Sequence, residues 1–569
     1  MNLFKKCLTV IFISGVIALE IHAVPRGGQD LIPAGHWVYE SFRKIELEAK
    51  NITFADFAPV SIQEFRNYLN EIDYDKLSSA GKKEYDRILE YLGEKNWSLN
   101  TGIFSIGVEP SLNPEFYFTS DITRNKNDII PWVYDYTKRQ PLLDLPLKLN
   151  LSDYVTLYMG LQAKQSRYAL EEPVTFFNDV FSQERFDLAL THDTYFNAGY
   201  LWDNGVGINF RLAIMSQSYG QSLMPSAILS EYLTDTTNVN LRIYSPLCSY
   251  DFNVTQFTRE SYLYTHRAEI RFFKMLEFSL IEGVFAYNTF DLRLMNPFAI
   301  FHGLGLFEMY EDEVKINSLF AVKANFIPVE NMRIYALYVQ NEHQMQCELD
   351  KNEGAEKIPE GFGIQTGVEY NVPLKKGYLH FGTEAYYASP FLFIKDSPML
   401  SFARVYTESL NNLDTTYYEW MGNPNGPDTL SLAFRAGYEE PGRWALDFIY
   451  NFTAKGENAG YNKLRESKWN YYTNKNTGSW IYGGDDMRSR IAPSGIVEYN
   501  NVITLRGSWC PSRWLTLTVQ PSYIFVNNFN HIEGNDRQGF QFALSTKIAL
   551  TKIPEKDLVP LDILNPISK

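Results

Sequence analysis

The chain has 569 residues, a formal net charge of −15 and a mean hydropathy of −0.26. An acidic chain of this kind is not expected to bind nucleic acid, because contact with phosphates requires a basic face. Cys248, Cys347 and Cys510 lie too far apart for a zinc site or a disulfide framework, so no metal or other cofactor is predicted.

The first 23 residues have the features of an export signal. Lys5 and Lys6 precede an apolar stretch over residues 7–19, and Ala23 stands at a suitable cleavage position. A membrane anchor is the alternative, but the stretch is shorter than the roughly 20 residues that a membrane-spanning helix needs. Residues 1–23 are therefore predicted to be a cleaved signal peptide.

Residues 24–98 carry apolar side chains at intervals of three and four residues, the spacing of one face of a helix. Ser61 and Glu64 form a capping box before the second such stretch, and Gly93 closes the third. This segment is predicted to be a small α-helical module of about three short helices. The apolar positions of the three stretches are Val38, Phe42, Ile45 and Ala49; Ile62, Phe65 and Leu69; and Tyr85, Ile88, Leu89 and Leu92.

From about residue 101 the apolar spacing changes to every second residue, which is typical of strands. The clearest example is a pair of segments, 143–151 and 155–163, joined by a tight turn. Strands of about ten residues with one apolar face suit a tilted crossing of a bilayer, whereas soluble sandwiches use strands of about five or six. The side chains predicted to face lipid in this pair are Leu143, Leu145, Leu147, Leu149, Val155, Leu157 and Met159.

The same alternation continues to residue 550. It predicts an all-β transmembrane barrel of about 18 antiparallel strands over residues 101–550. Short turns are expected at one end of the barrel, and the polar stretches 345–360, 409–428 and 454–495 are expected to form long loops at the other. Outer-membrane barrels keep short turns in the periplasm and long loops outside. The chain is therefore predicted to lie in the outer membrane of a bacterium with two membranes.

This orientation also places the two ends of the mature chain. The helical module of residues 24–98 and a tail over residues 551–569 are both expected on the periplasmic side, because such barrels begin and end there.

Two parts of the sequence resemble the Wzi-type capsule assembly family. One is HWVYESFRKIELEAKN at 36–51 followed by FAPVSIQEFRNYL at 57–69, and the other is YLYTHRAEIRFFKMLEFSLIEGVFAY at 262–287 followed by DLRLMNPFAIFH at 291–302. The resemblance implies an N-terminal helical bundle, an 18-stranded outer-membrane barrel and the binding of a surface polysaccharide. The opening segment also resembles S-layer-homology modules, which implies attachment to peptidoglycan.

One predicted strand carries charges on a single face. Arg267, Glu269 and Arg271 alternate with apolar neighbours, so they would form a polar track in the lumen if the apolar side meets lipid. Such a track could recognise an anionic or hydroxyl-rich ligand through the arginines. We favour the other interpretation, an ion-pair ladder between strands, because the lumen faces of barrels are generally polar.

The long loops are rich in aromatic residues among polar ones. Flat aromatic faces beside hydrogen-bonding groups suit sugar rings, so these residues are candidate polysaccharide contacts. Packing within the loops, or a place in the aromatic girdle at the membrane interface, is the alternative. The candidates are Trp469, Tyr471, Tyr472, Trp480 and Tyr482 in one loop and Tyr417, Tyr418 and Trp420 in another.

No HExxH, GxSxG or P-loop motif occurs, and no enzymatic activity is predicted. The leading hypothesis is an outer-membrane protein that binds surface polysaccharide of capsular type or helps to assemble it. A porin-like channel for small solutes is the first alternative, based on barrel size. The second is a structural tether that contacts peptidoglycan through residues 24–98.

Overall fold

The computed structural model describes most of the chain. The described residues are 22–25, 27–93, 95–100, 104–120, 140–165, 175–178, 186–288, 290–301, 315–342, 361–394, 400–410, 413–457, 471–473, 480–482 and 491–552. The predicted signal peptide up to residue 21, the predicted tail from residue 553 and the predicted loop 345–360 lie outside the described residues.

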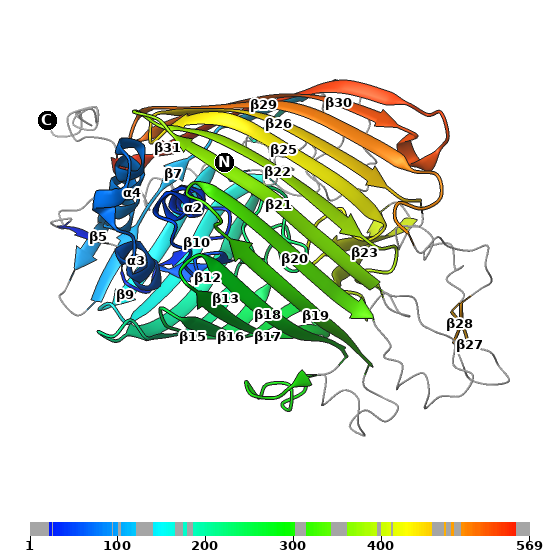
Figure 1. The fold of residues 1–569 in the computed structure, drawn as a ribbon, viewed down its shortest axis with the longest axis horizontal. Helices are drawn as coiled ribbons and strands as arrows, with labels where there is room; N and C mark the ends of the chain where they lie inside the picture. The colour runs from blue at the N-terminus through cyan, green and yellow to red at the C-terminus, as the bar shows by residue number, and fades with distance from the viewer. Residues whose placement is uncertain are drawn as a thin grey trace, which may run out of the picture.

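Antiparallel strands close into an 18-stranded barrel, which confirms the predicted fold class (Figure 1). The first strand is broken into β6 (Phe104–Val108), β7 (Ser111–Leu112) and β8 (Glu115–Thr119), and β31 pairs with β7 and β8 to close the barrel. The other barrel strands are β9 (Leu143–Leu151), β10 (Val155–Gln165), β12 (Phe186–Leu201), β13 (Gly207–Ile214), β15 (Thr237–Tyr244), β16 (Cys248–Thr258), β17 (Ser261–Phe272), β18 (Leu276–Tyr287), β19 (Lys315–Phe326), β20 (Met332–Glu342), β21 (Gly361–Pro373), β22 (Tyr378–Ala388), β25 (Thr429–Glu440), β26 (Trp444–Lys455), β29 (Glu498–Ser512), β30 (Leu515–Asn527) and β31 (Arg537–Ala549). β1 (His22–Pro25), β5 (Lys95–Asn100) and β11 (Thr175–Phe177) extend the same sheet.

The hairpin of β9 and β10 shows how the alternating pattern positions the wall. Leu157 and Met159 are 39% and 37% exposed on the outer face. Lys148, Asn150 and Thr156, from the alternate positions, are buried on the lumen side. Apolar side chains therefore point outward and polar ones inward, as predicted for a strand pair that crosses a bilayer.

Three helices gather at the barrel end where short turns join the strands (Figure 1). They are α2 (Trp37–Ala49), α3 (Ile62–Asn70) and α4 (Ser79–Leu92), with the short elements β2 (Leu31–Ile32), β3 (Phe57–Ala58), β4 (Val60–Ser61) and η1 (Tyr74–Lys76) between or beside them. Ser61 Oγ accepts a hydrogen bond from the Glu64 N–H at 3.2 Å, as the capping box predicts. No helix among the described residues is long and apolar enough to span a bilayer.

One prediction for α4 is wrong. Leu89 was assigned to the buried face, but its side chain is 51% exposed. α4 packs through residues four apart, namely Ala80, Glu84, Ile88 and Leu92, and Leu89 lies about 100° from that row.

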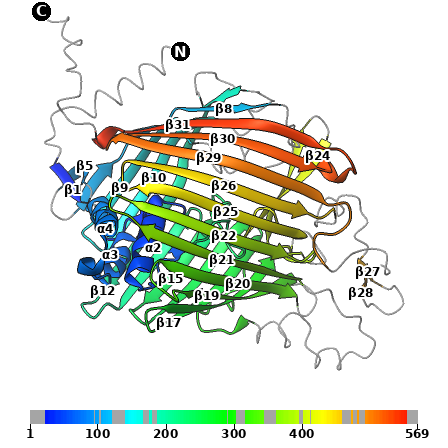
Figure 2. The same cartoon turned by 45° about the horizontal axis from the view of Figure 1, so that its top comes forward.

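Segments from both ends of the barrel fold into the lumen, which is visible when the barrel is turned (Figure 2). Residues 51–61 enter from the helical module. Residues 215–236, with β14 (Ser218–Tyr219), enter from the opposite end, as do the described parts of residues 389–428 (389–394, 400–410 and 413–428), with β23 (Ala403–Leu410) and β24 (Leu413–Trp420). β14 pairs with β3, so the two sides meet inside the barrel. The apolar core that results includes Phe57, Tyr219, Ile228, Phe285, Leu337, Leu392, Phe402 and Met421.

A further segment lies on the outside of the wall. Residues 290–301 cover the outer face of β16 to β18, where Phe301 packs on His266 with ring centroids 4.1 Å apart. His266 points outward but is only 9% exposed, because this segment covers it.

Candidate functional site: the plugged lumen and its outer mouth

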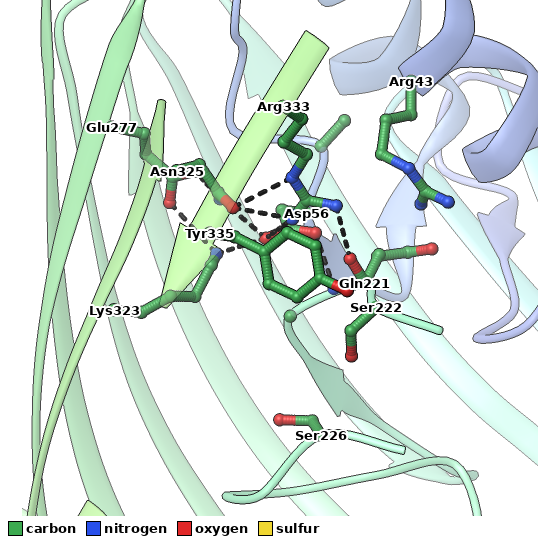
Figure 3. Close-up of polar contacts among 12 residues, drawn as sticks. Arg43, Asp56, Gln221, Ser222, Ser226, Glu277, Lys323, Asn325, Arg333 and Tyr335 are labelled. Carbon is green, nitrogen blue, oxygen red and sulfur yellow. Dashed lines mark hydrogen bonds and ion pairs between the residues drawn. The ribbon is translucent and has the colours of Figure 1, made fainter. Parts of the chain in front are cut away.

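Asp56 marks the junction between the helical module and the barrel wall (Figure 3). Its carboxylate pairs with Lys323 of β19 and with Arg333 of β20, whose Nη2 lies 3.4 Å away. Asn325 Nδ2 donates to it at 2.9 Å. The segment between α2 and α3 is therefore fixed to the wall by one buried carboxylate with three partners.

The same carboxylate holds the segment that enters from the opposite end. The Gln221 N–H donates to Asp56 Oδ1 at 2.6 Å, and Arg333 Nη1 donates to the Gln221 carbonyl at 2.7 Å (Figure 3). Two residues further on, the Leu223 N–H donates to the Glu384 carboxylate of β22 at 2.8 Å. The inserted segments and the wall thus form one continuous network.

A small cavity lies beside this junction. Its volume is about 30 Å³, and Glu46, Asp56 and Gln221 contribute to its lining. Burial raises the pKa of Glu46 to about 8, although hydrogen bonds from Thr53 oppose the rise. Burial alone would also raise the pKa of Asp56, but Lys323 and Arg333 hold it well below its usual range. Two carboxyl groups of one cavity therefore have pKa values shifted in opposite directions.

The predicted lumen track on β17 lies in a second network. Arg267 contacts Asp251 at 2.5 Å and Glu269 at 3.1 Å. Arg271 contacts Glu71, from the helical module, at 2.6 Å. All three track residues are buried and ion-paired, and their partners include a residue of the module as well as neighbouring strands.

A third network was not found from the sequence. Lys44 of α2 pairs with Glu439 of β25, and Arg435 joins Glu40 at 3.1 Å to Asp447 at 2.9 Å. Lys44 and Glu439 are 395 residues apart in the chain. No local spacing in the sequence pointed to this network, because Lys44 lies about 120° from the apolar face of its helix.

The outer mouth contains the predicted aromatic candidates that the structure describes. Trp420, at the end of β24, stacks on Phe393 with ring centroids 6.1 Å apart, and it packs against the lumen core. Tyr417 and Tyr418 lie on the same strand. Tyr471, Tyr472, Trp480 and Tyr482 lie on the small hairpin of β27 (Tyr471–Thr473) and β28 (Trp480–Tyr482), in which Tyr471 stands opposite Tyr482. Trp469 lies outside the described residues.

Two loops of the mouth are joined at their bases. The Asp428 carboxylate accepts hydrogen bonds from the Ser494 N–H at 3.0 Å and from its hydroxyl at 2.6 Å. The Glu457 N–H donates to the Ser494 carbonyl at 2.8 Å. Glu457 and Ser494, which flank the longer loop, therefore lie together, directly beside Asp428 at the start of β25.

No three His, Cys, Asp or Glu side chains come together as a metal site among the residues that the structure describes.

Comparison with known proteins identifies the fold. No family model matches the sequence, and a search of curated proteins found no match. Wzi of Escherichia coli, an outer-membrane protein involved in group 1 capsule assembly and described as a carbohydrate-binding β-barrel, matches 92% of this chain and 100% of its own, with 11% identity and a TM-score of 0.55. The match to the outer-membrane channel DcaP of Acinetobacter baumannii covers 79% of this chain and 98% of DcaP, with 9% identity and a TM-score of 0.34. The match to OprD of Pseudomonas aeruginosa covers 78% of this chain and 94% of OprD, with 8% identity and a TM-score of 0.35. The chain thus has the fold of an outer-membrane β-barrel, and its predicted resemblance to Wzi is confirmed as a likeness of fold.

Proposed function

We propose that this protein binds a surface polysaccharide of capsular type at the outer mouth of a plugged barrel, and that it thereby helps to assemble or retain that polysaccharide. In this proposal the protein is not an enzyme. The polysaccharide lies against the loops outside the membrane and does not cross the lumen.

The filling of the lumen from both ends is the observation that carries the proposal. The helical module occupies the end with short turns, and residues 215–236 and the described parts of 389–428 pack into the other end over an apolar core. Water-filled porin lumens are lined by polar groups, whereas here Phe57, Tyr219 and Phe402 meet in the interior. A barrel filled in this way is better suited to present a surface than to conduct solutes.

The chemistry of the mouth supports a sugar ligand. Two aromatic-rich loops start side by side, because Asp428 and Ser494 join their bases. Aromatic rings offer faces to the C–H side of sugars, and the half-buried amide of Asn425 in the same region suits hydroxyl groups. The carbohydrate-binding description of Wzi, which shares the fold, agrees with this interpretation.

Deletion of residues 458–490 tests the proposal. A short Gly-Ser linker can join the remaining ends, since Glu457 and Ser494 are in direct contact. We expect the deletion variant to lose binding to polysaccharide purified from the surface of the source bacterium, measured on protein in nanodiscs. Heat-modifiable migration in electrophoresis should show that the barrel still folds.

The alternatives predict different results. Steady conductance of the intact protein in a planar bilayer, with unchanged polysaccharide binding after the deletion, would favour a porin-like channel. Sedimentation with isolated peptidoglycan through residues 24–98, without polysaccharide binding, would favour a tether.

A further inference from the structure

The barrel end that carries the helices has an uneven distribution of charge. The turns that follow β9, β12 and β19 carry Asp153, Asp203 and Glu330. In contrast, the turns of three consecutive hairpins of the sheet, β21–β22, β25–β26 and β29–β30, have charged residues that are all basic: Lys375 with Lys376, then Arg443, then Arg513, with Glu440 before Arg443 at the end of β25. In a chain with a net charge of −15, this is a local reversal of sign.

Helix α4 lies against these hairpins and enlarges the basic surface. Lys83 Nζ donates to the Lys376 carbonyl at 3.4 Å, and Arg513 contacts Glu90 of α4 at 2.5 Å. Lys82 stands beside Lys83 on the helix. We call these residues the basic rim: Lys82, Lys83, Lys375, Lys376, Arg443 and Arg513.

Much of the positive charge of the basic rim has no acidic partner within the described part of the chain. Arg443 pairs with Glu440 at 3.0 Å, and Arg513 pairs with Glu90. The four lysines make no ion pair within 4 Å there, and Lys83, Lys375 and Lys376 are exposed. The rim therefore keeps a net positive charge that is open to solvent.

Aromatic side chains lie directly next to the basic rim on the outer wall. Trp444 follows Arg443 in the chain and is 41% exposed, and its strand partner Trp509 is 56% exposed. Tyr438 packs on Trp444 with ring centroids 4.9 Å apart. Exposed tryptophan and tyrosine residues mark the depth of the lipid head groups, so the basic rim lies at the level of the phosphates.

We propose that the basic rim binds the phosphate head groups of anionic phospholipid in the inner leaflet of the outer membrane. Clustered lysines at a membrane surface attract anionic lipids, and the neighbouring tryptophans hold the rim at head-group depth. The bound lipid would fix the rotation of the barrel about its axis and the position of α4. This role of the basic rim is independent of any ligand at the outer mouth.

Lipid association measured by electron spin resonance tests the proposal. Full-length protein is reconstituted with spin-labelled phosphatidylglycerol or phosphatidylcholine, and the motionally restricted fraction gives their relative association. We expect the wild-type protein to prefer phosphatidylglycerol by roughly threefold or more, as expected for several lysines at one surface. Raising the salt from about 0.1 M to about 1 M should remove the preference, since the screening length falls from about 10 Å to about 3 Å.

A matched pair of triple variants identifies the site. Replacement of Lys83, Lys375 and Lys376 with Gln should abolish the preference. Replacement of Lys50, Lys76 and Lys274 with Gln removes the same charge from separate elements at the same end and should preserve it. Both variants should migrate as folded barrels, because exposed lysines contribute little to stability.

Two outcomes would overturn the proposal. One is equal association of the two lipids with the wild-type protein, and the other is a preference that persists in the Lys83, Lys375 and Lys376 variant. Binding to peptidoglycan that this variant loses, with no lipid preference in the wild type, would assign the basic rim to the cell wall instead.

Discussion

Arg242 of β15 reaches from the barrel wall into the helical module, where its Nε lies 2.7 Å from Glu64 Oε1 of α3. Both side chains are at most 2% exposed, and Arg242 also contacts Asp251 of β16 at 2.6 Å. The Glu64 backbone N–H is the group that Ser61 caps, so one residue both starts α3 and fixes it to the wall. Docking of the module therefore depends on charges that have no access to water.

Asp56 is a second docking charge. Asp56→Asn should weaken docking of the module by about 1–3 kcal/mol, because Lys323 and Arg333 lose one charged partner but keep Glu277 and Glu369. Hydrogen exchange of α2 and α3 in the folded barrel measures the change. Asp86→Asn, an exposed carboxylate of α4, is the control and should alter exchange by less than about 1 kcal/mol. Equal protection in the two variants would show that the apolar core alone holds the module.

Docking should also depend on pH through Glu46. Its pKa is raised to about 8 by burial, so the folded chain keeps a proton that an unfolded module releases near pH 4.5. As far as the Glu46 carboxyl contributes, protection of α2 from hydrogen exchange should therefore be greatest below pH 4.5. It should fall as the pH rises from 4.5 to about 8, by at most about 1.4 kcal/mol per pH unit.

The Glu46→Gln variant should lack this part of the pH dependence, since an amide resembles the protonated acid. Asp75→Asn changes an exposed acid of the same module and should keep the wild-type profile. Identical profiles for wild type and Glu46→Gln between pH 5 and 8 would contradict the assignment.

The aromatic candidates of the long loop can be tested without deletion. Trp469→Ala combined with Trp480→Ala should weaken polysaccharide binding roughly tenfold or more, since each stacked ring contributes on the order of 1 kcal/mol. The matched control is Trp444→Ala with Trp509→Ala, which removes two tryptophans from the opposite end of the barrel. Retained binding in the first double variant would assign Trp469 and Trp480 to packing within the loop.

Orientation in the membrane is open to labelling of intact cells. With the native cysteines replaced by Ser, Lys82→Cys should resist a membrane-impermeant thiol reagent, because α4 lies at the end with short turns. Glu533→Cys, in the exposed connection between β30 and β31 at the other end, should react readily. The reverse result would show that the barrel is inserted with its long loops in the periplasm.

The sequence by itself determined the secondary structure and the outward face of the wall. The alternation of apolar and polar residues around Leu145 and Leu157 is a local property of the sequence, with a period of two. It shows which side chains meet lipid wherever the intervening residues of the strand are polar. The capping box of Ser61 and Glu64 is equally local, because four consecutive residues contain both partners.

Only the tertiary structure decided how the lumen is filled. Near the outer ends of β17 and β18, Leu263 and Phe285 point inward into an apolar core while Tyr264 and Val284 point outward. Both faces are apolar there, so alternation carries no information about which face is inside. The ion pairs that dock the module join residues such as Arg242 and Glu64, which are 178 positions apart. Charged residues so far apart in the sequence come together only when the barrel closes around the inserted segments. The local spacing of residues therefore cannot predict these ion pairs.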